Sequence, residues 1–580
     1  MNGSSLKTLP RVDVAVVGGG WSGLLMAKEL GARTGLTVAV LERGAPRKPQ
    51  EYAEGMDELD YAIRLRMMQD ASKETVTFRL TSKDRALPMR QFASFLPGDG
   101  VGGAGEHWNG STPRFVPDVF NIHTSTVNRY GVKKLPENHS IQDWGITWNE
   151  IEPWYAKAEQ LLGCSGQAGA DPFEGKRSTP FPNPPLKTPY FSSLFADAVK
   201  KLGYSPYPLP SGILSQAYRN PDGIVRAACA YCGFCERFGC MTGAKSQPTN
   251  LLLPVIAKQK TVSIRTGANV RRIVHKDGKT TGVTYKDAKG EEYFQPADLV
   301  ILSSWTLNNT RLLLLSKAGE AYDFATGKGV VGRNLTHQMT TGGTATLFFD
   351  KPLNSFMGAG STTMVMHDFD GDNFDHANLD FLRGAQLSSP SYGRRPIANF
   401  GTVPPSVKDT WGSEWKKAAV EYFDRTATIT VSAEHVAYKT NYFDLDPTYK
   451  DNLGDPLLRL TIDWTENERN MARFIGTKTA EIGRAMGARE VVSARPLGRY
   501  EVNAYKSTHV QGGTIMGASP ETSVVNPWLQ HWQVENLFVL GASTFPQNAS
   551  GNPTLTLLAQ TLRTAEALVD KYVKKPGRLG

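Results

Sequence analysis

The chain has 580 residues, of which 40% are hydrophobic and 21% are charged. This length exceeds one compact core, so we expect two or more structural units, and the composition excludes a disordered protein. No apolar run approaches the roughly 18 residues that a membrane-spanning helix needs. The net charge of +9 suits an anionic partner or surface, but Lys and Arg form no dense basic block, which argues against nucleic-acid binding.

The first residues, MNGSSLKTLPRVDV, contain neither an apolar stretch nor twin arginines. We therefore expect no export signal in this chain. The protein would then be cytoplasmic, processed, or exported on a partner.

The clearest motif lies near the N-terminus. The β-branched run VDVAVV (12–17) precedes GGGWSG and then LLMAKELGAR, which predicts a strand, a turn and a helix. A second strand, TVAVLE, ends at Glu42. Gly18, Gly20 and Gly23 would permit the turn, the approach of a pyrophosphate and close helix packing, while Glu42 would bind a ribose hydroxyl. The pattern predicts dinucleotide binding but does not separate FAD from NAD.

The remaining chain alternates strands and irregular sequence. Residues 261–287 predict strands joined by a KDGK turn, and ADLVILSS (297–304) predicts an apolar strand. From about 345 to 480, aromatic, Gly and Pro residues in short strand-like pieces indicate an antiparallel substrate-binding unit. Near the C-terminus, NLFVLGAS predicts a strand and turn, and NPTLTLLAQTLRTAEALVDKYV predicts an amphipathic helix that closes the fold.

Four of the five cysteines lie within CAYCGFCERFGC: Cys229, Cys232, Cys235 and Cys240. Structural zinc generally uses two separated pairs, and several disulfide pairings in so short a segment would be strained. The spacing C-x2-C-x2-C-x4-C is one residue longer at its last step than that of bacterial ferredoxins. Spacing alone favours an iron-sulfur cluster over zinc, with disulfides or free thiols as further alternatives. Cys164 stands apart, and we expect it to be a small buried apolar residue.

Three further segments resemble the glucose-methanol-choline (GMC) flavoprotein oxidoreductases. GDGVGGAGEHWNG (98–110) resembles a flavin-contact loop, VVGRNLTHQM (330–339) a mid-chain motif, and THVQGGTIMG with GASTFPQNASGNPTLT the C-terminal signature. The resemblance implies an α/β protein, α+β overall, with a Rossmann-like FAD-binding domain and an interleaved antiparallel-sheet substrate-binding domain. The implied FAD-binding domain consists of residues 8–115, 225–345 and 495–580 and includes the cysteine segment 229–240. The implied substrate-binding domain consists of residues 116–224 and 346–494.

The resemblance also implies which residues contact FAD. Besides the N-terminal motif they are Gly102, Gly103, His107, Asn109, Gly541 and Ala542. His107 falls five residues after Gly102, where some members bond a His covalently to the flavin 8α-methyl group, so we expect covalent FAD. The alternative is a His that only packs against the isoalloxazine ring. The sequence departs from relatives at SSW (303–305), where a small AAG turn is common, and at Ala542, where many have Asp.

Oxidising a secondary alcohol requires a base for the hydroxyl proton while hydride leaves carbon, and an imidazole suits that role. His509, in THVQGG, matches the active-site His of the family, and Asn552, in SGNPT, matches its partner position. An Asn there would orient the substrate oxygen. The alternatives are a core His and an Asn that caps the next helix, with Pro553 in its first turn.

Within the family, the cysteine segment and the following MTGAKSQP are most similar to the flavoprotein subunit of bacterial membrane-bound gluconate 2-dehydrogenase and to relatives acting on fructose, sorbitol, glucose or ketogluconate. This similarity implies a 3Fe-4S cluster on Cys232, Cys235 and Cys240, with Cys229 a spare thiol or the fourth ligand of a 4Fe-4S cluster. It also implies a small signal-bearing subunit, a multihaem cytochrome c subunit as electron acceptor, and a periplasmic location reached on a partner.

The substrate is the least constrained feature. Gluconate, oxidised to 2-ketogluconate, is favoured by the resemblance alone. A sugar acid would want a cationic clamp, and Arg394 and Arg395 are candidates, although such a loop pair is more typically solvated. The competing hypotheses are a soluble sugar oxidase that makes hydrogen peroxide without iron, and a non-catalytic electron-transfer subunit, which would have little reason to keep both His509 and Asn552.

Overall fold

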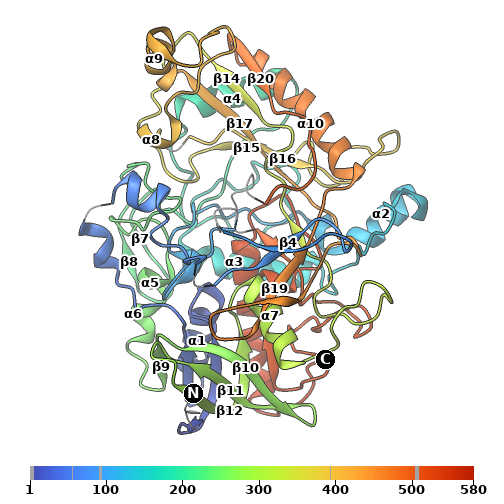
Figure 1. Cartoon of the computed structure of the whole chain (residues 1–580). Coiled ribbons are helices and arrows are strands. Elements are labelled where there is room, and N and C mark those ends of the chain that lie inside the picture. Colours follow the sequence, from blue (N-terminus) through green and yellow to red (C-terminus); the bar gives the residue numbers. More distant parts are fainter. Residues whose placement is uncertain (1–5, 55, 73, 91–94, 392, 503–508) are drawn as a thin grey trace.

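The computed structural model describes residues 6–54, 56–72, 74–90, 95–391, 393–502 and 509–580. Figure 1 shows a lower lobe that contains both chain ends and an upper lobe built from the middle of the chain. The lower lobe is organised around an eight-stranded sheet of order β10-β11-β12-β2-β3-β9, in which β1 and β22 also pair with β12. Its strands are β1 (Lys7–Thr8), β2 (Val12–Val17), β3 (Val38–Leu41), β9 (Val262–Arg265), β10 (Asn269–Lys276), β11 (Lys279–Lys286), β12 (Glu292–Leu302) and β22 (Leu537–Val539).

Strand β12 connects the two halves of this sheet. Its first part pairs antiparallel with β11, and its second part pairs parallel with β2 on one side and β22 on the other. The parallel strands are continuous apolar runs because helices cover both faces of such a sheet, and residues 14–16 and 300–302 are fully buried. The strands predicted at 12–17 and 297–304 are therefore confirmed.

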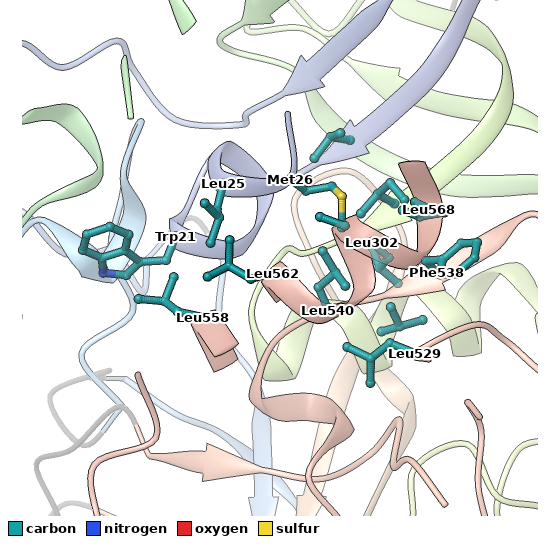
Figure 2. Close-up of a cluster of buried hydrophobic side chains, with 14 of the residues drawn as sticks. Trp21, Leu25, Met26, Leu302, Leu529, Phe538, Leu540, Leu558, Leu562 and Leu568 are labelled. Carbon is teal, nitrogen blue, oxygen red and sulfur yellow. The ribbon is translucent and has the colours of Figure 1, made fainter. Parts of the chain in front are cut away.

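The core of the lower lobe lies between this sheet and two helices, α1 (Trp21–Arg33) and α11 (Thr554–Ala567). Figure 2 shows Leu25 of α1 facing Leu562 of α11, and Met26 of α1 beside Leu302 of β12. The predicted C-terminal helix is confirmed, and it closes the fold by packing on the first helix of the chain.

The upper lobe contains a six-stranded antiparallel sheet of order β20-β14-β17-β16-β15-β6. Its strands are β6 (Tyr207–Pro208), β14 (Ala345–Phe348), β15 (Met364–Met366), β16 (Ala385–Ser388), β17 (Thr426–Ala433) and β20 (Glu490–Ser493). One prediction for this region was wrong, because α10 (Glu466–Ala485) is a 20-residue helix where short strand-like pieces were expected. Thr465 and Glu468 form a capping box that starts this helix.

Smaller sheets and the other helices connect the lobes. β4 (Thr77–Arg79) pairs parallel with β19 (Pro456–Thr461), so one sheet joins a segment expected in the FAD-binding domain to one expected in the substrate-binding domain. The domain boundaries stay a prediction. The remaining strands are β5 (Leu87–Pro88), β7 (Tyr218–Arg219), β8 (Val225–Arg226), β13 (Thr336–His337), β18 (Tyr442–Lys450) and β21 (Val510–Gln511). The remaining α-helices are α2 (Ile122–Tyr130), α3 (Trp148–Leu162), α4 (Tyr190–Lys201), α5 (Pro248–Leu251), α6 (Leu253–Ile256), α7 (Thr306–Ser316), α8 (Pro396–Asn399) and α9 (Gly412–Glu421). Across the described ranges, no helix is long and apolar enough to span a membrane.

Candidate active site

An elongated cavity of about 1450 Å³, counting the part open to solvent, lies at the carboxyl ends of β2 and β3. The glycine motif forms one wall. Gly18 has φ of 102°, and a Cβ there would lie 2.6 Å from the Ser303 carbonyl oxygen. A Cβ on Gly23 would lie 2.0 Å from the Gly18 carbonyl oxygen, so helix α1 packs against the turn only because this residue is Gly. Gly20 lines the cavity at the N-terminus of α1, the end of a helix that favours a phosphate group.

Glu42 lies at the same wall, directly after β3. Its carboxylate accepts hydrogen bonds from the backbone N–H groups of Gly19 and Gly44, both at 2.8 Å. Burial raises the pKa of Glu42 above its usual range, and the two N–H donors oppose that shift. A carboxylate has about four acceptor positions, so two remain for ribose hydroxyls.

The cavity is also lined by Gly102, Gly103, Gly541 and Ala542, which were predicted to contact the flavin. Trp305 also lines the cavity and has a left-handed φ of 75°, the conformation that the more common glycine turn would adopt without strain. Apart from the unusual SSW, no residue pattern indicated this conformation. Shape, glycine turn and acidic residue together fit a dinucleotide such as FAD.

The structure brings the two predicted catalytic residues together. Asn552 Nδ2 lies 3.3 Å from His509 Nε2. Burial lowers the pKa of His509 to about 4, so its imidazole is neutral at physiological pH. The capping alternative for Asn552 was wrong, since α11 begins at Thr554 with Pro553 at the N-cap and no side-chain cap. Pro553 and Thr554 line the cavity, so the pair borders the flavin site.

A third residue, Gln338, contacts His509 of this pair. This residue was not identified as a site residue from the sequence. It follows β13 and lies opposite His509, because His337 pairs with Val510 across β13 and β21. Its Oε1 lies 2.6 Å from His509 Nδ1. Its signal in the sequence was its place in the 330–339 motif, but which side chain of that motif faces the site depends on strand register.

The four thiols of the cysteine segment lie around a small apolar cluster. Cys235 is buried in it, Cys229 and Cys240 pack against it, and Cys232 is exposed. Burial raises the pKa of Cys229 to about 11 and that of Cys235 to about 12, so these thiols are protonated unless a metal draws off the proton. The predicted burial of Cys164 is confirmed.

Two backbone N–H groups point at sulfurs of this segment. Tyr231 N–H donates to Cys229 Sγ at 3.3 Å, and Lys245 N–H donates to Cys240 Sγ at 3.4 Å. Hydrogen bonds to cysteine sulfurs are one of the means by which proteins tune iron-sulfur clusters, so the donor set fits such a group. No three His, Cys, Asp or Glu side chains in the described part of the chain converge on a single metal ion.

Lys245 joins the cysteine segment to the flavin-contact loop. Its side chain is fully buried, and its ammonium group donates only to backbone carbonyl oxygens from both segments. These are the carbonyl oxygens of Trp108, Cys235 and Phe238 at 2.8 Å and Glu106 at 3.2 Å. Since Trp108 lines the cavity, the cysteine segment lies directly behind that wall.

Glu106 provides a buried negative charge beside this lysine. Its carboxylate is also fully buried and accepts hydrogen bonds from the Tyr52 hydroxyl, the Gln247 amide, and the backbone N–H and hydroxyl of Thr249. Burial raises its pKa, and these donors oppose the shift. The flavin-contact loop is therefore held by Lys245, which bonds its carbonyl oxygens, and by its own Glu106, which bonds residues outside the loop.

Two predicted flavin contacts do not line the cavity. His107 is buried, and its Nε2 has no hydrogen-bond partner among the described residues. The His107 carbonyl oxygen accepts a hydrogen bond from the Arg237 N–H of the cysteine segment at 2.7 Å. Burial, with Lys245 nearby, lowers the pKa of the His107 imidazole to about 3. Asn109 Oδ1 accepts from Ser111 N–H at 3.0 Å, which stabilises a local turn. Neither side chain is among the described cavity-lining residues.

Arg394 and Arg395 are half-buried, and both donate to backbone carbonyl oxygens. Arg394 donates to the Thr426 carbonyl oxygen at 2.6 Å. Arg395 donates to the Glu236 carbonyl oxygen at 3.1 Å, and its guanidinium lies 5.0 Å from the centre of the Phe238 ring. Arg395 thus packs on the cysteine segment, a contact that the sequence did not indicate.

A glycine-turn dinucleotide cavity flanked by a His–Asn pair defines a flavin-dependent oxidoreductase. Family models described as GMC oxidoreductase match residues 185–340 and 437–561. Because a relative 40% identical is also matched over 98% of this chain, the chain belongs to the GMC oxidoreductase family. It is an FAD-dependent oxidoreductase with the expected α/β fold.

That relative is a gluconate 2-dehydrogenase flavoprotein from Pantoea cypripedii, 95% of which is covered. A fructose dehydrogenase large subunit from Gluconobacter japonicus is 26% identical over 96% of this chain and 98% of its own. Among solved structures, pyridoxine 4-oxidase from Mesorbium loti is 18% identical and superposes with a TM-score of 0.59, covering 96% of this chain and 98% of its own. This last likeness supports the fold alone.

Proposed function

We propose that this protein is a dehydrogenase for a secondary alcohol of a sugar acid or sugar, with gluconate, oxidised to 2-ketogluconate, as the favoured substrate. The observation that carries the proposal is that one flavin-type cavity borders both the His509–Asn552 pair and, behind Trp108, a four-thiol segment. The 40% identity to a gluconate 2-dehydrogenase flavoprotein favours the substrate.

The residues divide the work on the substrate between them. His509 is neutral because burial lowers its pKa to about 4, so Nε2 accepts the hydroxyl proton. Asn552 carries an amide N–H within 3.3 Å of that nitrogen, and this donor would bind the same substrate oxygen and orient its carbon.

Bound FAD would supply the hydride acceptor, and an iron-sulfur cluster on the cysteine segment would supply one-electron transfer to a cytochrome c subunit. Glu42 and the glycine motif would hold the dinucleotide, and Cys232, Cys235 and Cys240 would hold a 3Fe-4S cluster. Cys229 would be a spare thiol or the fourth ligand of a 4Fe-4S cluster. A small signal-bearing subunit would carry the chain to the periplasmic side of the membrane, where the cytochrome would be anchored.

Covalent attachment of FAD through His107 is part of the proposal. Among the described residues, its Nε2 is buried without a hydrogen-bond partner, which is compatible with a covalent bond at this atom. The His107 side chain does not, however, line the cavity. Denaturation in acid decides between linkage and packing. Flavin that stays with the protein supports linkage at His107, and flavin released to the supernatant shows that the residue only packs in the wall.

The test of the function is made on purified protein with any subunits that accompany it. We expect gluconate to bleach the flavin anaerobically, three or four irons per chain, and reoxidation by cytochrome c. Cys235→Ser should lose the iron and this reoxidation while gluconate still bleaches the flavin, and Cys164→Ser, an isosteric change at an unrelated buried thiol, should keep both. Bleaching by fructose rather than gluconate would reassign the substrate. Absence of iron with production of hydrogen peroxide would indicate the oxidase alternative.

A further inference from the structure

Gln338 links His509 to the loop that carries Asn552 through a single side-chain amide. It is 1% exposed. Its Oε1 lies 2.6 Å from His509 Nδ1, while its Nε2 donates to the carbonyl oxygens of Ala549 and Ser550 at 3.1 and 2.5 Å. Residues 549–551 lead directly to Asn552. The amide therefore ties the strand that carries the base to the loop that carries its partner.

The surroundings determine the orientation of this amide. Two carbonyl oxygens accept hydrogen bonds and cannot donate them, so the side of the amide that faces Ala549 and Ser550 must be the NH2 group. The oxygen then faces His509, where it can only accept. His509 Nδ1 must therefore carry the proton, and Nε2 keeps its lone pair.

The second ring nitrogen supports the same assignment. Nε2 of His509 faces the amide nitrogen of Asn552, a donor that needs an acceptor. A tautomer protonated on Nε2 would place two donors against each other at 3.3 Å and two acceptors against each other at 2.6 Å. Both hydrogen bonds form only when the proton is on Nδ1.

We propose that Gln338 is a positioning residue that holds His509 in the tautomer with an unprotonated Nε2 and fixes the loop that presents Asn552. This inference rests on the proposed function insofar as Nε2 is the base. It gives a catalytic-site role to one residue of the 330–339 motif. Ser550 adds a second anchor to the loop, since its hydroxyl donates to the buried Asp370 carboxylate at 2.5 Å.

The titratable side chains on the neighbouring elements have other partners. His337 on β13 lies 2.6 Å from the Tyr500 hydroxyl, and His435 accepts from His337 N–H at 3.2 Å. Asp370 accepts from Ser550. Burial is the largest cause of the lowered pKa of His509. A charge placed at position 338 would act directly on the His509 ring, because the side-chain oxygen of that residue lies 2.6 Å from Nδ1.

The experiment uses the isosteric change Gln338→Glu. The carboxylate keeps an acceptor at Nδ1 and adds a negative charge. This charge favours the imidazolium and should raise the pKa of His509 by roughly one to three units. The readout is the pH dependence of His509 carbethoxylation by diethyl pyrocarbonate, followed by peptide mass spectrometry, because only the neutral ring reacts. We expect the midpoint to move upward by at least about one unit. An unchanged midpoint in a variant that retains flavin would overturn the proposal.

Gln338→Met removes both roles of the amide. We expect kcat to fall about 10-fold to 100-fold with little change in KM, and the carbethoxylation midpoint to stay within about half a unit of the wild type, since no charge is added. Gln259→Glu is the matched control because Gln259 is a partly buried glutamine that contacts Lys28 rather than His509. It should leave both readouts unchanged. If Gln338→Met does not fold, Gln338→Glu carries the test alone.

The two proposals fail separately. Carbethoxylation needs no substrate, so a shifted midpoint supports the role of Gln338 even if no sugar acid bleaches the flavin. Bleaching by gluconate together with an unshifted midpoint would keep the dehydrogenase and remove the positioning role.

Discussion

The two sides of the flavin cavity are built from opposite kinds of polar group. On the His509 side, the amides of Gln338 and Asn552 are neutral partners of the ring. Behind Trp108 the contacts are charged, with a fully buried Lys245 and Glu106 satisfied by carbonyl oxygens and by hydroxyl and amide donors.

This difference fits the two tasks proposed for them. A base must change its protonation state in each cycle. Neutral neighbours suit it because they tolerate both the neutral imidazole and the imidazolium. A segment that held thiolates would keep its negative charge throughout the cycle. A fixed positive charge on Lys245 would stabilise it, because buried charges persist only where they are paired or hydrogen-bonded. The predictions below change one side and measure whether the other is affected.

The largest effect is expected from His509→Ala. Without the base, the rate of anaerobic flavin bleaching by substrate should fall roughly 10²-fold to 10⁴-fold. Flavin and iron content should stay at wild-type levels, because the cysteine side is untouched. Stopped-flow absorbance measures the rate, and His275→Gln, far from the pair and bonded only to the Ser316 carbonyl oxygen, is the control. A loss smaller than threefold would remove His509 from the chemistry.

Lys245→Met tests the charged side. Four buried carbonyl oxygens lose their donor, so we expect the free energy of unfolding to fall by about 2–4 kcal/mol, with earlier loss of iron on heating. The anaerobic bleaching rate at low temperature should change by less than about threefold. Lys289→Met, at an exposed position, controls for the loss of a charge. Equal damage to bleaching and to iron retention would show that the two sides are not independent.

A smaller, graded effect is expected from pH. Burial lowers the pKa of His107 to about 3 and those of His509 and His531 to about 4, against 6.5 in the unfolded chain. Between pH 6.5 and 4 the unfolded state binds more protons, so each residue lowers stability by roughly 1.4 kcal/mol per pH unit of acidification. Thermal unfolding from pH 7 to 5 measures the slope, and His531→Gln should remove about a third of this contribution.

His367 has the opposite sign. Burial alone would lower its pKa, but the Asp171 carboxylate, 2.8 Å from Nδ1, raises it to about 9. Its contribution to stability is complete below pH 6.5 and is lost as the pH rises through 9. Asp171→Asn should abolish this loss on the alkaline side and leave the acid slope unchanged.

Much of this arrangement could be predicted from local sequence. The strand, glycine turn and helix at 12–33 were predictable because one short segment contains all three signals. The pairing of His509 with Asn552 followed from resemblance, since 43 residues separate them. Helix α10 was not predicted, although the capping box of Thr465 and Glu468 can be recognised in the sequence.

The contacts that were missed depend on how distant segments meet. Gln338 faces His509 because of the register between two two-residue strands, and Arg395 reaches the cysteine segment from 159 residues away. Trp305 adopts a left-handed backbone that its side chain disfavours, so propensity argues against the observed turn. No local pattern encodes such contacts.

The long strand β12 has a consequence for biosynthesis. It pairs with β2, near residue 12, and with β22, near residue 537, so the sheet beneath the cavity cannot close until almost the whole chain has left the ribosome. Contacts this distant in sequence form slowly, and unpaired strand edges stay exposed while they wait. Loading of the cofactor is therefore a late, post-translational event, and a chain truncated before β22 should be recovered colourless and prone to aggregate.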